Sequence, residues 1–220
     1  MRATVVLPVK RFAHAKTRLA EAVGPPGRAA LMKAMLADSL AALAAAELVD
    51  RVVVVTGEGR AERVGLDAAR GGSLEVEVLQ EPEDHGHSAA AVLGIVRALA
   101  LGAECSALLP GDCPFVDARE LDGALGRMEP GRVAVVPDRH GTGTNALLLA
   151  PADAIGPAFG DGSCERHLDR ATRAGFEAVR EELPSLALDL DTPEDLDALR
   201  QRAEAEPAAA PRTAAALAAL

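Results

Sequence analysis

The sequence predicts a doubly wound α/β fold, and two observations carry this prediction. First, apolar runs of strand length recur along the 220-residue chain, and the Val-rich ones are almost continuously apolar, as at 3–9 and 51–56. Such runs are typical of strands buried on both faces of a parallel sheet. Second, amphipathic segments of helix length separate the runs, and this alternation predicts a mostly parallel sheet flanked by helices. The length suits one domain with a sizeable core.

The expected elements follow in order along the chain. Strands are expected at 3–9, 51–56, 74–80, 106–112, 132–138, 144–150 and 176–181. Helices are expected at about 27–47, 60–70, 88–101 and 163–174. The run "LALDLD" (186–191) is also strand-like, and a last helix follows it. At its start Thr192 can cap the N-terminus, Pro193 suits the first helical position and Asp195 stands at the third.

The chain shows no internal repeat and no linker long enough to mark a domain boundary. We therefore expect one domain over residues 1–206. An Ala-rich C-terminal tail follows over 207–220, and it is either disordered or a short docked helix.

Charge and composition argue against several classes of partner. The formal net charge is −10, which disfavours a general binder of nucleic acids or of anionic membranes. The chain has no Trp or Tyr, so it lacks aromatic platforms on which single-stranded nucleic acids stack. A small anionic ligand stays compatible with a local basic pocket. Three cysteines without C-x-x-C spacing predict no disulfide framework and a reducing compartment.

Neither a signal peptide nor a membrane span is expected. Lys10 and Arg11 interrupt the only early apolar run, and no uncharged apolar stretch reaches the ~18 residues that a span needs. The sequence therefore predicts a soluble, cytoplasmic protein.

A basic stretch follows the first expected strand. "VKRFAHAKTRL" (9–19) places Lys10, Arg11, Lys16 and Arg18 close together in an otherwise acidic chain. Ligands of open α/β sheets bind beyond the carboxyl ends of the strands. Cations at this strand end therefore favour a ligand that carries phosphate groups.

Carboxylates stand at two further strand ends. Asp112 closes the run "SALLPGD", and Asp189 and Asp191 share one face of the strand-like "LALDLD". Hydrated Mg²⁺ takes one or two carboxylates together with substrate phosphates, and metal and cations neutralise a transferring phosphoryl or nucleotidyl group. An Asp before a helix is also a common N-cap, so spacing alone leaves a metal site and simple caps as alternatives.

Two Gly-rich stretches are able to bind an anion through backbone N–H groups. "GTGTN" (141–145) is neither a Walker loop nor a dinucleotide fingerprint, and a plain turn is the favoured alternative. In "FGDGSCERH" (159–167), Ser163 is an N-cap candidate for the next helix, a position that also suits anions. The five histidines do not form a metal-binding set. The pair His85 and His87 is suggestive, but no third ligand stands nearby, and surface loop residues are the favoured interpretation.

Five motifs, taken in order, resemble one enzyme family. They are "LPVKRFAHAKTRL", "LLPGDCP", "VVPDRHGTGTNALLL", "FGDGSCERH" and "LDLDTPEDL". From about residue 4 to 200 the chain is similar to the guanylyltransferases of deazaflavin coenzyme F-420 biosynthesis. This resemblance implies a nucleotidyltransferase-like, Rossmann-like domain that transfers GMP from GTP to phosphoenolpyruvate or 2-phospho-L-lactate and releases pyrophosphate. Phosphoenolpyruvate is preferred, because bacterial relatives favour it and the composition suggests a GC-rich bacterial genome.

The resemblance implies roles for the residues around the nucleotide. Three carboxylates match the family's ligands for two Mg²⁺ ions: Asp112, Asp189 and Asp191. Three cations of the basic loop should contact the triphosphate of the co-substrate GTP: Lys10, Lys16 and Arg18. Lys16, Arg18 and Asp112 are the expected catalytic groups.

The resemblance also places the second substrate. Thr144, Gly160 and Ser163 match positions that bind the phospho-acid in relatives that use phosphoenolpyruvate. Many relatives carry Leu-Asn before the G-D-x-P strand, where this chain has Ser88-Ala89, so Ser88 is the expected nucleotide contact. The expected protein partner is the transferase that receives the activated product.

Two alternatives remain. One is a nucleotidyltransferase for a sugar phosphate or a pterin, which the missing Gly-rich first loop disfavours. The other is a non-catalytic nucleotide-binding regulator on the same fold, which the retained carboxylates and basic loop disfavour.

Overall fold

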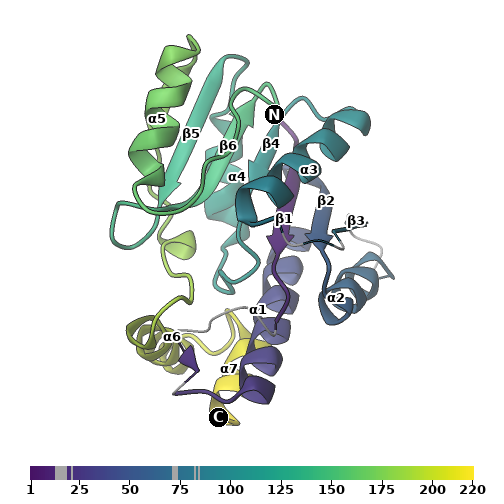
Figure 1. Cartoon of the computed structure of the whole chain (residues 1–220), viewed down its shortest axis with the longest axis vertical. Coiled ribbons are helices and arrows are strands. Elements are labelled where there is room, and N and C mark those ends of the chain that lie inside the picture. The colour runs from purple at the N-terminus through teal and green to yellow at the C-terminus, as the bar shows by residue number, and fades with distance from the viewer. Residues whose placement is uncertain (13–18, 21, 71–73, 82, 84) are drawn as a thin grey trace.

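The computed structural model describes residues 1–12, 19, 20, 22–70, 74–81, 83 and 85–220. Within them, seven strands form one sheet in the order β3-β2-β1-β4-β6-β5-β7 (Figure 1). The strands are β1 (Ala3–Val9), β2 (Val49–Thr56), β3 (Glu75–Gln80), β4 (Ser106–Leu108), β5 (Arg132–Pro137), β6 (Thr144–Ala150) and β7 (Glu177–Arg180). The sheet is mostly parallel, as predicted, and it is mixed because β6 runs antiparallel to its neighbours.

The direction of β6 decides which residues meet at the ligand-binding edge. β1 is parallel to β2 and β4, but β6 runs antiparallel to both of its neighbours, β4 and β5. The amino end of β6 therefore lies at the same edge as the carboxyl ends of β1 and β4. This direction puts Thr144, the first residue of β6, beside the turn that follows β4.

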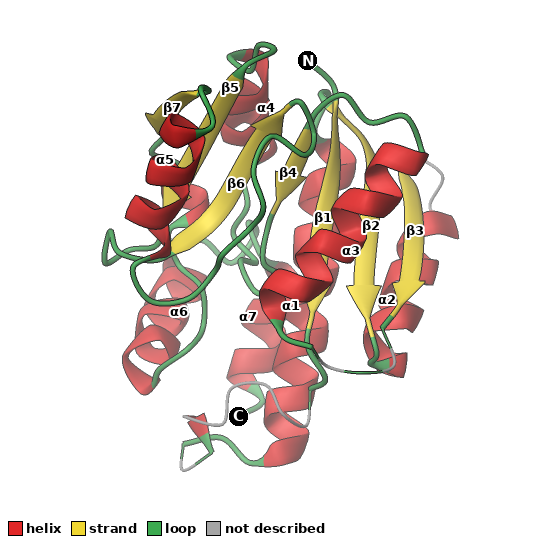
Figure 2. Ribbon diagram, turned by 45° about the horizontal axis from the view of Figure 1, so that its top comes forward, coloured by secondary structure: helices red, strands yellow, loops and turns green. Residues whose placement is uncertain are grey.

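Helices cover both faces of the sheet. The helices are α1 (Pro25–Ala45), α2 (Gly59–Arg70), α3 (His87–Ala100), α4 (Ala118–Gly126), α5 (Ser163–Arg173), α6 (Pro193–Ala205) and α7 (Pro211–Ala218), with a 3-10 helix η2 (Pro184–Leu186). Figure 2 shows α3 and α5 in front of the strands and α1, α2 and α4 behind them. In the described part of the chain, no helix is both long and apolar enough to cross a bilayer.

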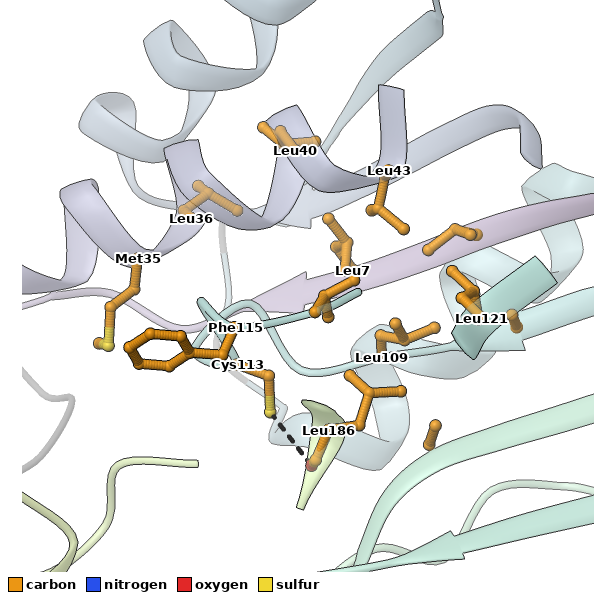
Figure 3. Close-up of a cluster of buried hydrophobic side chains, with 14 of the residues drawn as sticks. Leu7, Met35, Leu36, Leu40, Leu43, Leu109, Cys113, Phe115, Leu121 and Leu186 are labelled. Atoms are coloured by element: carbon orange, nitrogen blue, oxygen red, sulfur yellow. Dashed lines mark hydrogen bonds between the residues drawn. The ribbon is translucent and has the colours of Figure 1, made fainter. Parts of the chain in front are cut away.

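Successive side chains of β1 point to opposite faces of the sheet, and the core accordingly has two layers, one on each face. Val5 and Leu7 belong to the larger apolar cluster, under α1, whereas Val6 faces the smaller cluster, under α3. Figure 3 shows Leu36, Leu40 and Leu43 of α1 in the larger cluster, at the spacing that brings side chains onto one helix face.

Gly94 explains how closely α3 approaches the sheet. A Cβ at this position would collide with Val6 of β1, so a larger residue there would push the helix away. This close approach holds the middle of α3 against β1, and the amino end of the helix borders the ligand-binding edge.

The structure confirms the expected strands and helices in the first half of the chain and corrects three expectations. β4 ends at Leu108, so Asp112 lies in a turn rather than in a strand. The run 186–191 is not a strand, because η2 precedes it and residues 187–191 are irregular. Helix α4 was not expected, although Asp117 caps it by accepting from the N–H groups of Arg119 and Glu120.

The C-terminal part of the chain contains two helices. Thr192 and Asp195 form the complete capping box at the start of α6, which confirms the expected helix start. Within the tail, residues Pro211–Ala218 form α7, which packs against α1. Of the two alternatives for the tail, the structure therefore shows a docked helix.

Candidate active site

A cavity of about 570 Å³ opens at the carboxyl edge of the sheet. Residues from β1, the start of α3, the turn after β4, the start of β6, the loop before α5 and the segment before α6 line it. Among them are Lys10, Ser88, Asp112, Thr144, Gly160, Asp189 and Asp191. The structure thus brings together seven residues that the sequence predicted to act in one site.

Two expected residues cannot be placed and one lies behind the cavity wall. Lys16 and Arg18, the expected triphosphate contacts, lie outside the described residues. Ser163 is fully buried, and its side chain hydrogen bonds to Thr144 rather than lining the cavity.

Asp112 sits in a tight turn anchored on three sides. Gly111 packs closely on β1, because a Cβ there would come within 2.9 Å of Val9 Cγ2. The Ser39 hydroxyl of α1 lies 3.1 Å from the Cys113 carbonyl oxygen, and Cys113 Sγ donates to the Leu186 carbonyl oxygen at 3.7 Å (Figure 3). These contacts hold Asp112, a residue that is 8% exposed, at the cavity wall.

Asn145, which the sequence analysis did not single out, holds the segment that leads to the other two carboxylates. Its Nδ2 donates to the carbonyl oxygens of Leu186 (2.8 Å) and Ala187 (3.2 Å) and lies 3.3 Å from Asp189 Oδ1. The Leu186 carbonyl therefore receives hydrogen bonds from both Asn145 and Cys113. This shared acceptor ties the segment that carries Asp189 to the turn that carries Asp112.

The donor set fits a hydrated Mg²⁺ ion that shares its ligands with a substrate. Among the described residues, no three His, Cys, Asp or Glu side chains form a ready-made metal-binding group. Mg²⁺ seldom needs one, because it keeps several waters and binds through one or two carboxylates plus substrate phosphates. Asp112, Asp189 and Asp191 all line one cavity, and their carboxylate oxygens are of the hard type that Mg²⁺ prefers.

The described start of the basic stretch borders the same cavity. Lys10 follows β1 and is exposed at the cavity, and it also lines an adjoining pocket with Arg11 and His87. The N–H of Phe12 donates to Glu58 Oε2 at 3.1 Å, and the Phe12 side chain is buried. The described start of the stretch, residues 9–12, therefore leaves the sheet in a fixed direction, with Lys10 at the cavity.

A hydrogen-bonded network lies behind Thr144. Thr144 Oγ1 is 3.1 Å from the Ser163 hydroxyl and 3.0 Å from His167 Nδ1. His167 Nε2 accepts from the N–H of Ala158 at 2.8 Å. His167 belongs to α5, in the helix expected over 163–174, and its side chain is fully buried.

Ser163 does not cap α5. Gly162 is the N-cap, with a φ of +69°, and Ser163 is the first helical residue, so the N-cap expectation was wrong. The preceding Gly160 has a φ of +112°, a conformation that favours glycine. The glycines therefore allow the sharp turn that brings the loop to the cavity.

Ser88 joins two walls of the cavity. Its Oγ accepts a hydrogen bond from the N–H of Phe159 at 3.0 Å, which ties the start of α3 to the loop before α5. The Phe159 ring packs edge-on against His87 and His167, with centroid distances of 4.7 and 5.3 Å. A contact of Ser88 with the nucleotide stays a prediction.

The buried imidazole makes stability depend on pH. Burial, followed by the nearby Arg170 and Arg166 guanidinium groups, lowers the pKa of His167 from 6.5 to about 4. The unfolded chain therefore binds a proton at a higher pH than the folded chain. The contribution of His167 to the free energy of unfolding is therefore fully present above pH 6.5. Between pH 6.5 and pH 4 the free energy of unfolding should fall by about 2–3 kcal/mol, because the unfolded chain takes up the proton first.

Urea unfolding followed by circular dichroism measures this loss, since the chain has no Trp or Tyr for fluorescence. The His167→Asn variant provides the reference for all other titrating groups. Wild type should lose more stability than this variant on acidification. Parallel pH profiles for the two proteins would contradict the expected role of His167.

Comparison with known proteins reveals close sequence relatives. A family model described as guanylyl transferase CofC like matches residues 3–206. A phosphoenolpyruvate guanylyltransferase of Conexibacter woesei is 45% identical over 200 residues, which cover 89% of this chain and 86% of the relative. One of Sphaerobacter thermophilus is 38% identical over 199 residues, covering 90% and 93%.

Solved structures share the fold at low sequence identity. A putative nucleotide-diphospho-sugar transferase from Desulfovibrio desulfuricans G20 superimposes with a TM-score of 0.72 at 19% identity, covering 99% of this chain and 94% of that one. A nucleotidyl transferase from Methanothermobacter gives a TM-score of 0.62 at 21% identity, covering 92% and 97%. The sheet and its flanking helices are thus a fold found in nucleotidyltransferases.

Proposed function

The chain belongs to the guanylyl transferase CofC-like family, and from this premise we propose that it transfers the guanylyl group of GTP to phosphoenolpyruvate. It is a nucleotidyltransferase enzyme. The observation that carries the proposal for the site is the single cavity in which Lys10, Asp112 and Thr144 meet. The Lys10 ammonium group can bind a triphosphate, and the Asp112 carboxylate can bind a metal ion. The Thr144 hydroxyl can donate a hydrogen bond to an anionic acid.

The reaction is a displacement at phosphorus. A phosphate oxygen of the acid attacks the α-phosphorus of GTP, the bond from the α-phosphorus to the bridging oxygen breaks, and pyrophosphate leaves with that oxygen. The acid's phosphate is already a nucleophile, so no side chain needs to remove a proton. Catalysis therefore depends on positioning and on neutralising charge.

The residues of the cavity divide these tasks. Lys10 lies where it can bind the triphosphate and stabilise the charge that develops on pyrophosphate. Thr144 and Gly160 line the same cavity, where they can orient the phospho-acid for attack. Lys16 and Arg18 are proposed to complete the triphosphate site.

We propose that Asp112, Asp189 and Asp191 hold Mg²⁺ at this cavity, in the hydrated form that the donor set fits. When bound, Mg²⁺ would neutralise phosphate charge and help orient the reacting groups. Without cations nearby, the three carboxylates would repel the negatively charged nucleotide. Binding of GTP therefore needs cations at the same cavity.

Membership of the family supports a proposal for the pathway and for the acceptor. The activated product is a mixed phosphoanhydride of the kind needed in coenzyme F-420 biosynthesis, and we propose hand-over to the next transferase. 2-Phospho-L-lactate, the alternative acceptor, differs from phosphoenolpyruvate by two hydrogens, because a single bond to a methyl group replaces the double bond to the methylene. A pocket that reads so small a difference discriminates weakly.

Release of pyrophosphate tests the function. The full-length chain with GTP and Mg²⁺ should release pyrophosphate fastest with phosphoenolpyruvate, compared with 2-phospho-L-lactate, 3-phosphoglycerate and a sugar phosphate. Each acid is also tested with CTP. Turnover only with the sugar phosphate, or only with CTP, would contradict the proposal.

Metal removal is expected to stop the reaction. Without a divalent ion, three carboxylates face the triphosphate and its charge is not neutralised. Excess EDTA should lower pyrophosphate release by at least about 10²-fold, the scale of losing a charge-stabilising group, and added Mg²⁺ should restore it. Unchanged turnover in EDTA would overturn the metal assignment and leave the guanylyl transfer standing.

A further inference from the structure

The hydrogen bonds around His167 fix which of its nitrogens carries the proton. Nε2 accepts from the backbone N–H of Ala158 at 2.8 Å, so this nitrogen must present a lone pair. A neutral imidazole then carries its proton on Nδ1. Nδ1 lies 3.0 Å from Thr144 Oγ1, so the ring donates to the Thr144 hydroxyl oxygen.

Ser163 supplies a second donor to the same oxygen. Its side chain is fully buried, and its Oγ lies 3.1 Å from Thr144 Oγ1. A hydroxyl oxygen has two lone pairs and one hydrogen. With Ser163 and His167 both donating, the two lone pairs of Thr144 are occupied, and only its own hydrogen remains available.

Thr144 faces the cavity from the start of β6, whereas Ser163 and His167 lie behind it. The only direction left for the Thr144 hydrogen is therefore toward the cavity. We propose that His167 is a positioning residue. Together with Ser163 it occupies both lone pairs of the Thr144 hydroxyl, so that this hydroxyl can only donate, and it donates to an anionic oxygen of the phospho-acid.

This inference rests on the proposed function, because it names the group that one of the two substrates meets. It adds a role for a residue that does not touch substrate. It also explains how Ser163, although buried, affects binding of the acid: Ser163 acts through the Thr144 hydroxyl.

The loop around the network is held rigidly enough for such a role. Arg166 donates to the Ala158 carbonyl oxygen through Nε at 3.2 Å and Nη2 at 3.1 Å. The adjacent Phe159 N–H donates to Ser88 Oγ at 3.0 Å. Ala158 is thus fixed on both sides, so its N–H keeps pointing at His167 Nε2.

The tautomer can be read directly in the substrate-free protein. Nitrogen-15 NMR of the histidine rings distinguishes a protonated Nδ1 from a protonated Nε2. His167 should show a neutral ring protonated at Nδ1 at pH 7. A ring protonated at Nε2 would overturn the inference whatever the enzyme's activity.

Kinetics then test the action through Thr144. Thr144→Val should raise the KM for phosphoenolpyruvate by about 10- to 100-fold, the scale of a lost hydrogen bond to a charged group, and should change the KM for GTP less than about twofold. His167→Gln keeps an acceptor near Ala158 but loses the donor at Nδ1, so it should raise the acid KM by about tenfold.

A matched variant and a double variant exclude a merely structural effect. The side-chain nitrogen of Asn corresponds to Nδ1, so His167→Asn should recover most of the acid affinity that His167→Gln loses. In the Thr144→Val background, His167→Gln should add nothing further, because the hydroxyl that it orients is gone.

The outcomes separate this inference from the proposed function. If wild type turns over but the two substitutions are additive, or GTP and acid KM values rise together, the inference fails alone. If wild type releases no pyrophosphate with any phospho-acid, both fail, because no acid remains for Thr144 to hold.

Discussion

Asp112→Asn should lower kcat for pyrophosphate release by about 10²–10³-fold, the range found when a group that stabilises transition-state charge is removed. The substitution keeps the size of the side chain and removes its charge. Asp112 is 8% exposed in a turn held by Gly111, Ser39 and Cys113, so the new amide should stay in place. Steady-state turnover at several Mg²⁺ concentrations measures the effect.

Asp197→Asn is the matched control for this prediction. Asp197 is an exposed carboxylate on α6 that pairs with Arg200 at 3.4 Å and does not line the cavity. Its removal changes the net charge by the same amount and should leave kcat unchanged. If Asp112→Asn kept at least a third of wild-type turnover, Asp112 would not be a metal ligand or a catalytic group.

The positions of most site residues could be predicted because strand ends determine them. Lys10 follows β1, Asp112 follows β4 and Thr144 begins β6. The first two follow from the rule that ligands bind beyond carboxyl ends of parallel strands. Thr144 reaches the same edge only because β6 is antiparallel. The apolar residues of this strand show that it is buried but do not show in which direction it runs.

The segment 186–191 shows why an alternating pattern can mislead. Leu186, Leu188 and Leu190 are buried while Asp191 is exposed, so the burial does alternate as in a strand. In the described part of the chain, however, this segment has no strand partner. The Asn145 side chain takes the place of a partner strand by donating to two of its carbonyl oxygens.

His167 could not have been assigned from the sequence for a related reason. Its partners are Ala158, nine positions before it, and Thr144, twenty-three positions before it. A buried polar side chain is stable only when its hydrogen bonds are satisfied, and those partners are set by tertiary structure. Composition and spacing show the histidine but not the contacts that bury it.

Asp38→Ala should lower the free energy of unfolding by about 2–4 kcal/mol, because it removes a buried charged acceptor. Asp38 belongs to α1, and its side chain is 1% exposed. It accepts from the Thr213 N–H at 2.7 Å and from Arg212 Nη1 at 3.1 Å. Ala210, the N-cap of α7, has no side chain that can cap, so α1 supplies this acceptor to the tail helix.

Urea unfolding followed by circular dichroism tests this prediction against a matched carboxylate. Asp122 also accepts from two backbone N–H groups, those of Glu47 and Leu48, each at 2.8 Å, but it is only partly buried. Asp122→Ala should therefore cost about 1 kcal/mol. Asp38→Asn keeps one acceptor oxygen and should fall between Asp38→Ala and wild type. Equal losses for Asp38→Ala and Asp122→Ala would show that burial of the Asp38 charge adds nothing to docking of α7.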